Sequence, residues 1–331
     1  MTLPQPLDLS RSQVLDTARA SAWYRIQSVV ASQTALAVGA LWDRVERDRI
    51  AESWRILLPQ AVALIAAQST TASSGAGMYV AQTISDAHAD PAGVAVNTSR
   101  LIDRAVIEYQ MLMPLFRTLH RIDQGVPAAD ALASGRILAG LIGSQTTRDI
   151  ARESVEIAMV AEPKVTGYVR YLVAPSCGRC AVLAGRVYPW SAGFLRHPRC
   201  DCQHRPIVNS ERPAARSSVE GSASSYFKSL SEADQNKHFG VDVAERIRSG
   251  ESMSRAVNAD RTMWRANYPA SRTVGDLPRP IVNAVMAQAN GDRAKAVEAL
   301  RGYGLINESG HRTFFAKRNS GKKLPTAAPR A

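Results

Sequence analysis

All four cysteines of this 331-residue chain lie close together in the sequence, at Cys177, Cys180, Cys200 and Cys202. The first two form a C-x-x-C pair, and the other two end the run H-P-R-C-D-C that begins at His197. Structural Zn²⁺ sites take four thiolate or imidazole ligands, usually from two short loops. The spacing therefore predicts a structural zinc site. We expect Cys177, Cys180 and Cys200 to bind first, with His197 and Cys202 competing for the last position.

The glycine between the first two cysteines, Gly178, suits a tight turn that would point both thiols at one ion. Two disulfides are the main alternative, although clustered cysteines in a reducing cytoplasm more often bind metal. A redox-active C-x-x-C begins a helix in a thioredoxin-like fold, and nothing in the sequence indicates that context. A nucleophile pair could join Cys200 with His197 or His204, but catalytic pairs meet in space and sequence proximity says little.

The net charge of +12 is concentrated in the second half of the chain. Residues 1–160 hold 14 arginines, no lysine and 15 acidic residues, whereas residues 161–331 hold 27 basic and 14 acidic residues. An excess of positive charge favours anionic partners, most obviously nucleic acid. We therefore expect DNA contacts through the C-terminal half.

No membrane partner is expected, because no run approaches the roughly 20 apolar residues of a membrane span. The longest apolar run, Val62 to Ala67, is far shorter. The N-terminus lacks the charged-then-apolar pattern of a signal peptide, which favours a cytoplasm as the place where the chain is made and kept.

Residues 1–160 are predicted to form a helical N-terminal domain. The first helix has apolar residues at a four-residue step, which predicts its buried face: Val14, Ala18, Ala22, Ile26 and Val30. Between Leu101 and Leu119 a second apolar face is predicted, with a kink at Pro114: Ile102, Val106, Tyr109, Met113 and Phe116. In the last long helix, residues 130–159, small residues should permit close helix contact: Gly135, Ala139 and Gly143.

The pattern changes at Pro163, where residues 166–174 and 185–190 read as two strands that bracket the first cysteine pair. They predict a small β-containing unit over 163–208, held by the Cys/His motif. A serine-rich linker over 209–225, a helical C-terminal region over 226–308 and a basic disordered tail over 309–331 should follow. In this region Ser229 is expected to start a capping box, and Asp292 to cap a later helix. The predicted class is therefore α+β, predominantly helical.

At the cysteine motif the sequence resembles the MuF-like minor capsid proteins, named after the head-morphogenesis protein of phage Mu. The resemblance rests on the order C-x-x-C at Cys177–Cys180, then G-R-V-Y at Gly185–Tyr188, then H-P-R-C-D-C at His197–Cys202. Residues 226–260 and 293–306 look like the segments that follow this motif in actinobacteriophage members. The resemblance covers residues 165–306.

This resemblance implies a non-enzymatic minor capsid or head-morphogenesis protein of a tailed phage. Such a protein joins the procapsid near the portal and assists head assembly and DNA packaging or delivery. The implied partners are the portal protein, the major capsid or scaffolding protein, and packaged DNA. The implied location is inside the capsid, after assembly in the host cytoplasm.

Two other functions remain open from the sequence. A capsid maturation protease or other assembly enzyme is one, because such enzymes are encoded beside this family. Against it, no serine has a nucleophile-elbow context, and His88 and His120 lie on ordinary predicted helices. A zinc-containing nucleic-acid-binding protein is the other, but it would leave the helical domain over positions 1–160 unexplained.

Overall fold

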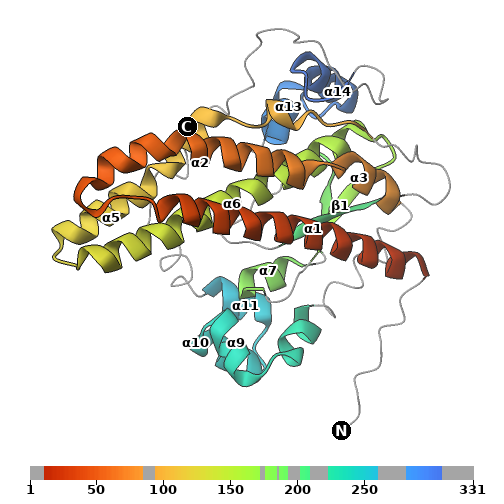
Figure 1. Ribbon diagram of the computed structural model, residues 1–331. Coiled ribbons are helices and arrows are strands. Elements are labelled where there is room, and N and C mark those ends of the chain that lie inside the picture. Colours follow the sequence, from red (N-terminus) through yellow and green to blue (C-terminus); the bar gives the residue numbers. More distant parts are fainter. Residues whose placement is uncertain are drawn as a thin grey trace.

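The computed structural model describes residues 11–84, 94–171, 176–184, 186–192, 202–208, 223–259 and 281–307. These residues are predominantly helical and contain one three-stranded antiparallel sheet (Figure 1), which confirms the predicted predominantly helical α+β class. Most of the predicted linker and the basic tail lie outside the described residues.

The body of the protein is a bundle of long helices that lie lengthwise against one another (Figure 1). The three longest are α1 (Arg11–Trp42), α2 (Ile50–Ser73) and α6 (Ala128–Ala161). Three shorter helices complete it: α3 (Ala76–Ile84), α4 (Arg104–Met111) and α5 (Met113–Asp123). Pro59 lies inside α2, which continues through it.

Small residues on α6 let α1 and α5 approach closely, as the sequence predicts. A Cβ atom at Gly135 would overlap both the Trp42 ring and the Thr118 hydroxyl. At Gly143 it would lie 3.1 Å from Val38. The indole N–H of Trp42 donates to the Leu132 carbonyl at 3.0 Å, which fixes the ring in this gap. The sequence pattern therefore located the tightest contact between α6 and its neighbours.

The buried face of α1 differs from the predicted one. Ala20, Trp23, Val30 and Val38 are buried, whereas Ile26 is 53% exposed. A four-residue step overshoots one helical turn of about 3.6 residues, so the predicted row drifts steadily off one face. The prediction of a buried Ile26 is therefore wrong.

The segment predicted as one kinked helix is two helices that meet at Leu112. Pro114 lies in the first turn of α5, where its missing N–H is not needed. Tyr109 and Phe116 were predicted to be buried but are 66% and 52% exposed. The residues that enter the core are Ile107, Met111 and Leu115. Because the helix breaks at Leu112, the apolar positions of α4 and α5 do not follow one common repeat. A prediction that assumed a single helix therefore gave the wrong buried face.

The sheet has the order β2-β1-β3, with strands β1 (Gly167–Tyr171), β2 (Val187–Pro189) and β3 (Gln203–Ile207). Gly167 pairs with Pro189 on one side and with Ile207 on the other. The first two strands lie within the predicted ones. The third was missed, because Q-H-R-P-I has charge, a proline and little β propensity.

Two groups of C-terminal helices lie on opposite sides of the body (Figure 1). One group holds residues 223–229, α9 (Glu232–Phe239), α10 (Val241–Arg248) and α11 (Met253–Ala259). The other holds α13 (Ile281–Gln288) and α14 (Arg293–Gly302), with Asp292 as the predicted N-cap. The helix start expected at Ser229 lies instead at Ser231, the N-cap of α9, whose hydroxyl accepts from the Asp234 N–H at 3.2 Å.

Within Arg47–Ile84 one helix is long and apolar enough to cross a membrane, judged by length and composition. The expectation that no segment reaches this level was wrong, because many alanines raise the average hydropathy. Half of its most apolar window is buried inside the protein, as in a core helix. The burial of Trp54, Leu57 and Ile65 in the bundle accounts for the apolar composition.

Replacing Gly135 with alanine tests the close helix contact. The new methyl group overlaps Trp42 and Thr118, so we expect the free energy of unfolding to fall by about 1–3 kcal/mol despite the higher helix propensity of alanine. Gly302→Ala is the matched control, because nothing lies within 4 Å of its Cβ position. Urea unfolding of both variants decides the point. Equal stability of the two would contradict the packing described here.

Candidate functional site

The described cysteines lie in or against one apolar cluster where the sheet joins the bundle. Cys177 is the N-cap of α7 (Gly178–Leu183), Cys180 lies within that helix, and Cys202 directly precedes β3. Cys180 and Cys202 belong to one buried apolar cluster, and the half-buried Cys177 packs against it. None of these three cysteines forms a disulfide bond in the structure. Residues from both halves of the motif thus lie in one apolar cluster, but the three described thiols are not placed to hold a metal ion.

The remaining predicted ligands, His197 and Cys200, lie outside the described residues. Within the described ranges, no group of three or more His, Cys, Asp or Glu side chains is placed to hold a metal ion. The complete ligand set thus stays a prediction. What the structure adds is that Cys177, Cys180 and Cys202 share one cluster although they come from opposite ends of the motif.

Gly178 has a different role from the predicted turn. It is the first residue of α7, and a Cβ atom there would lie 2.8 Å from the Phe239 ring. The helix beginning at the C-x-x-C pair was also not expected from the sequence. Gly178 is therefore a packing residue that lets α7 approach α9.

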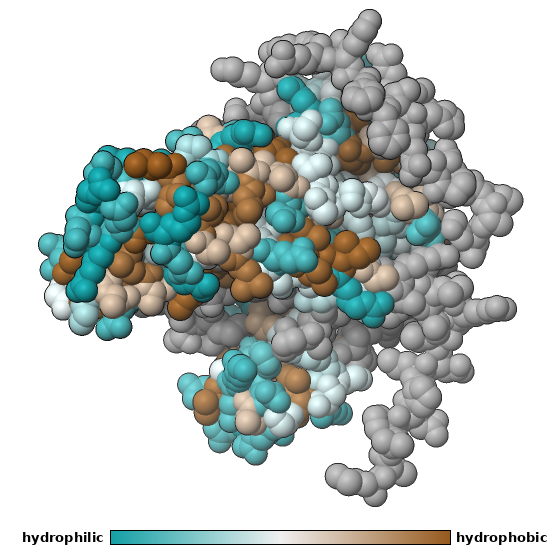
Figure 2. Space-filling view, viewed as in Figure 1, coloured by the Kyte–Doolittle hydropathy of each residue, from teal (hydrophilic) through white to brown (hydrophobic). Residues whose placement is uncertain are grey.

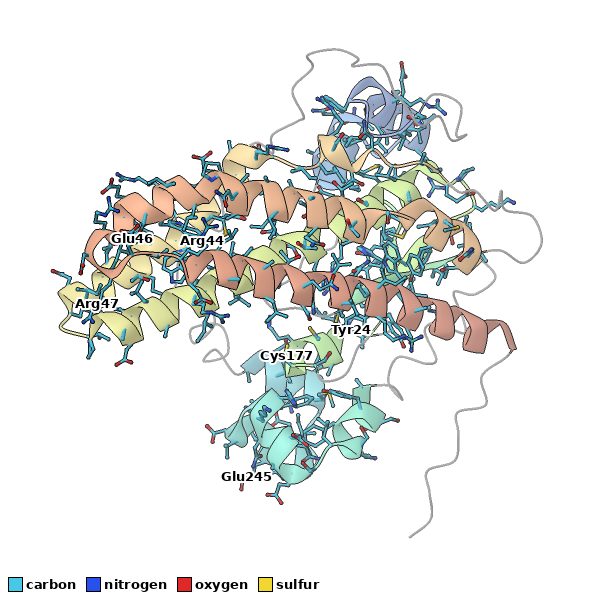
Figure 3. The ribbon with its side chains drawn as sticks, in the orientation of Figure 1. Tyr24, Arg44, Glu46, Arg47, Cys177 and Glu245 are labelled. Carbon is cyan, nitrogen blue, oxygen red and sulfur yellow. The ribbon has the colours of Figure 1, made fainter. Side chains whose placement is uncertain are left out.

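The helix α7 faces two hydrophobic cores. Cys180 packs in the core of the body, whereas Ala181 and Val182 pack with Phe239 and the other apolar residues of the α9–α11 group. Figure 3 shows Cys177 at this junction, between α1 and the α9–α11 group. A bond between α7 and the strand β3 would therefore fix one group of helices against the body.

A tyrosine anchors the chain just before Cys177. The Tyr226 hydroxyl accepts from the Ser176 N–H at 2.6 Å and donates to the Ser176 carbonyl at 2.8 Å. Burial raises the pKa of Tyr226, and the nearby Cys177 and Cys180 thiols raise it further. The segment that follows the predicted linker thus holds the chain beside the first cysteine.

The second half of the motif is anchored by buried polar groups of α6. The Arg152 guanidinium, 2% exposed, donates through Nε to the Cys202 carbonyl at 3.0 Å. Two residues on, His204 Nε2 lies 3.3 Å from Glu156 Oε1, and the two side chains are only 1% and 5% exposed. The Tyr79 hydroxyl donates to the His204 carbonyl at 2.6 Å. These contacts fix β3 against α6 and α3.

Glu156 and its neighbours were missed by the sequence reasoning. Glu156 stands in the apolar run V-E-I-A-M-V near the end of α6, and one acidic residue on a helix is usually solvated. The buried Glu156 carboxylate also acts on Tyr168 of β1. The pKa of Tyr168 is raised well above its ordinary value, first by the burial of Tyr168 itself and then by the Glu156 carboxylate. The one sequence signal of this burial was a single acidic residue within an apolar run.

A comparison of the sequence with models of protein families finds a match, which covers the bundle and the sheet. The model of the VG15 protein family matches residues 15–229, which is more than half of the chain. The chain belongs to the VG15 family. This is a phage-type family of viral gene products, which indicates a phage-encoded protein. No curated protein and no solved structure matches the chain.

The VG15 match delimits the site within the fold. It includes the bundle, the three strands described above and all four cysteines, and it ends at residue 229, before α9. The two anchors described above, Arg152–Cys202 and Glu156–His204, both lie inside it. Helices α9 to α11, α13 and α14 lie outside it, so the match covers the bundle, the sheet and the cysteine motif.

Replacing Tyr226 with phenylalanine tests the anchor at Ser176. The change leaves the buried Ser176 N–H and carbonyl without this partner, so we expect a loss of about 1–3 kcal/mol of unfolding free energy. Tyr303→Phe is the matched control, because its hydroxyl donates to Gln288 at an exposed site. Equal denaturation midpoints for the two variants would show that the Tyr226 contacts contribute nothing.

Proposed function

We propose that this VG15 protein is a minor capsid or head-morphogenesis protein of a tailed phage. It joins the procapsid near the portal, stays inside the capsid, and assists head assembly and DNA packaging or delivery. The observation that carries the proposal is the ordered MuF-like motif, C-x-x-C, G-R-V-Y and H-P-R-C-D-C, in a chain of a phage-type family. The gathering of Cys177, Cys180 and Cys202 at one junction supports treating that motif as one unit.

The charge distribution supports a position between protein and DNA. Positions 1–160 have a net charge of −1, so they suit contacts with portal, capsid or scaffolding protein. Positions 161–331 carry +13 and suit contacts with the phosphate backbone. The N-terminal half thus suits protein partners, and the C-terminal half suits DNA.

A non-enzymatic role is favoured over a maturation protease. A serine or cysteine protease of the histidine-dependent type needs a histidine that substrate can reach, next to the nucleophile. The histidine–carboxylate pair that the described residues form, His204 with Glu156, is enclosed in the core and holds β3 in place. His120 is exposed on α5, where it lies on the surface of an ordinary helix.

We also propose a structural Zn²⁺ ion at the cysteine junction. Structural zinc sites take their ligands from two short segments, and the C-x-x-C and H-P-R-C-D-C segments supply cysteines that lie in or against one apolar cluster. Cys177, Cys180, Cys200 and either His197 or Cys202 would hold the ion, and it would cross-link α7 to the sheet. The ion would act through stability and not through catalysis.

The zinc proposal predicts about one bound zinc per chain in reduced protein purified without chelator. Cys177→Ser and Cys180→Ser should each abolish stoichiometric binding, measured by elemental analysis. Comparing His197→Ala with Cys202→Ser identifies the fourth ligand. The exposed His120→Ala is the control and should keep its metal. Wild-type protein purified without reductant that is metal-free and has no titratable thiols would instead establish the disulfide alternative.

The proposed location is tested by mass spectrometry of purified particles. Peptides from the whole chain should occur in mature virions and in procapsids at a few copies per particle. Deleting the gene should yield misassembled or DNA-poor heads. When the deletion is complemented with a copy that lacks residues 309–331, we expect the number of assembled heads to recover more fully than their DNA content. Absence from both particle types would overturn the capsid role and favour an assembly enzyme or a free nucleic-acid-binding protein.

A further inference from the structure

The front of the bundle carries a surface without charge. Residues 26–42 of α1 and residues 56–84 of α2 and α3 contain no Asp, Glu, Lys, Arg or His, although many of them face solvent. On α1, Val29 and Leu36 are 57% and 68% exposed, and Ile56 on α2 is 66% exposed. Figure 2 shows hydrophobic and pale residues gathered over α1 and α2. Depletion of charge is the compositional mark of the centre of a protein interface.

The exposed residues of α1 follow a strict helical repeat. They alternate steps of four and three along one side of the helix: Ala22, Ile26, Val29, Gln33, Leu36 and Ala40. All of them from Ile26 onward are exposed, and Ala22 is half-buried. A repeat of about 3.5 residues is the seam by which one helix packs along another. The occupant that this stripe fits is therefore a helix.

The stripe is complementary to itself. Reversed about residue 31, it places Ala22 opposite Ala40, Ile26 opposite Leu36, and Val29 opposite Gln33. Small residues then face small residues at the ends, and the two longest aliphatic side chains meet between them. A two-fold axis requires this kind of self-complementary patch. We propose that α1 is the interface of an antiparallel homodimer, with α2 continuing the contact.

Charge favours a second copy at this place. Two molecules with a net charge of +12 repel one another, but positions 1–160 contribute −1 to that total. An interface on α1 and α2 is thus built on the half where this repulsion is weakest.

Other classes of partner fit the stripe less well. DNA requires cations, and the stripe has none. A membrane-surface helix has basic residues along its polar edge and large aromatic residues on its apolar face. Here the outward side of α2 instead carries neutral polar residues, among them Gln60, Thr70 and Thr71.

The size of the surface indicates a reversible dimer. From Ala22 to Ala40 the helix rises about 27 Å at ~1.5 Å per residue. Neighbouring helices lie ~8–10 Å apart, so α1 and α2 together offer about 540 Å² on each copy. A standard interface buries roughly 800 Å² per partner. The surface is smaller than a standard interface, so we expect an association that depends on protein concentration.

Sedimentation velocity of the full chain tests the proposal, from about 1 to 200 μM protein. The wild type should pass from monomer to dimer across this range. Val29→Glu, which places two like charges in the seam, should raise the dissociation constant at least about tenfold. Val241→Glu is the matched control, since Val241 is 60% exposed on α10, and it should dimerise as the wild type does.

A charge pair tests the orientation. Ile26→Lys and Leu36→Glu should each weaken the dimer, and the double variant should recover it, because the introduced lysine would face the introduced glutamate of the other copy only in the antiparallel arrangement. A double variant weaker than both single variants would overturn the orientation. A wild type that stays monomeric at the highest concentration, or a dimer indifferent to Val29→Glu, would overturn the homodimer and assign the stripe to another protein or to another segment of this chain.

Discussion

The structure depends on the close packing of one helix, α6, against its neighbours. Its first half approaches α1 and α5 so closely that Gly135 leaves no room for a methyl group beside Trp42. Its second half carries Arg152 and Glu156, which contact Cys202 and His204. Because both halves are one continuous helix of 34 residues, the packing of the bundle fixes where the sheet can lie.

Buried charge makes this arrangement specific. A buried arginine or glutamate is costly unless it is partnered, and a shift of β3 by one residue would exchange the two faces of the strand. Cys202 and His204 would then leave the side on which Arg152 and Glu156 lie. The polar contacts thus select one register for a strand whose own sequence has little β propensity. The same selection places the Cys202 thiol in the cluster that Cys180 enters from α7.

The sequence predicted what depends on local pattern. The glycines and alanine of α6, the first two strands and the Asp292 cap each follow from residue types at short spacing. The buried face of α1 was wrong because it depends on which side α2 and α6 occupy. The helix start was displaced by two residues because both Ser229 and Ser231 fit the capping-box pattern in part.

Long-range partners account for the other differences. Strand β3 forms because β1 offers it a complete antiparallel edge and α6 offers it buried polar partners, neither of which is visible in Q-H-R-P-I. Gly178 reads as a turn residue until Phe239, far along the chain, lies against it. Glu156 reads as a surface residue until His204 is brought to it. In each case the deciding contact joins segments that are distant in the sequence.

The two proposed contacts of the chain rest on different forces. A neutral helix seam associates by burial of apolar surface, which salt leaves intact or strengthens. The proposed contact of the basic C-terminal half with DNA would release counterions, so salt would weaken it steeply. Because the charge is divided so unevenly between positions 1–160 and 161–331, neither contact interferes electrostatically with the other. Under the proposed function, such a chain would associate with protein before DNA enters the head and would hold DNA afterwards. The cluster that contains the described cysteines includes residues of both halves.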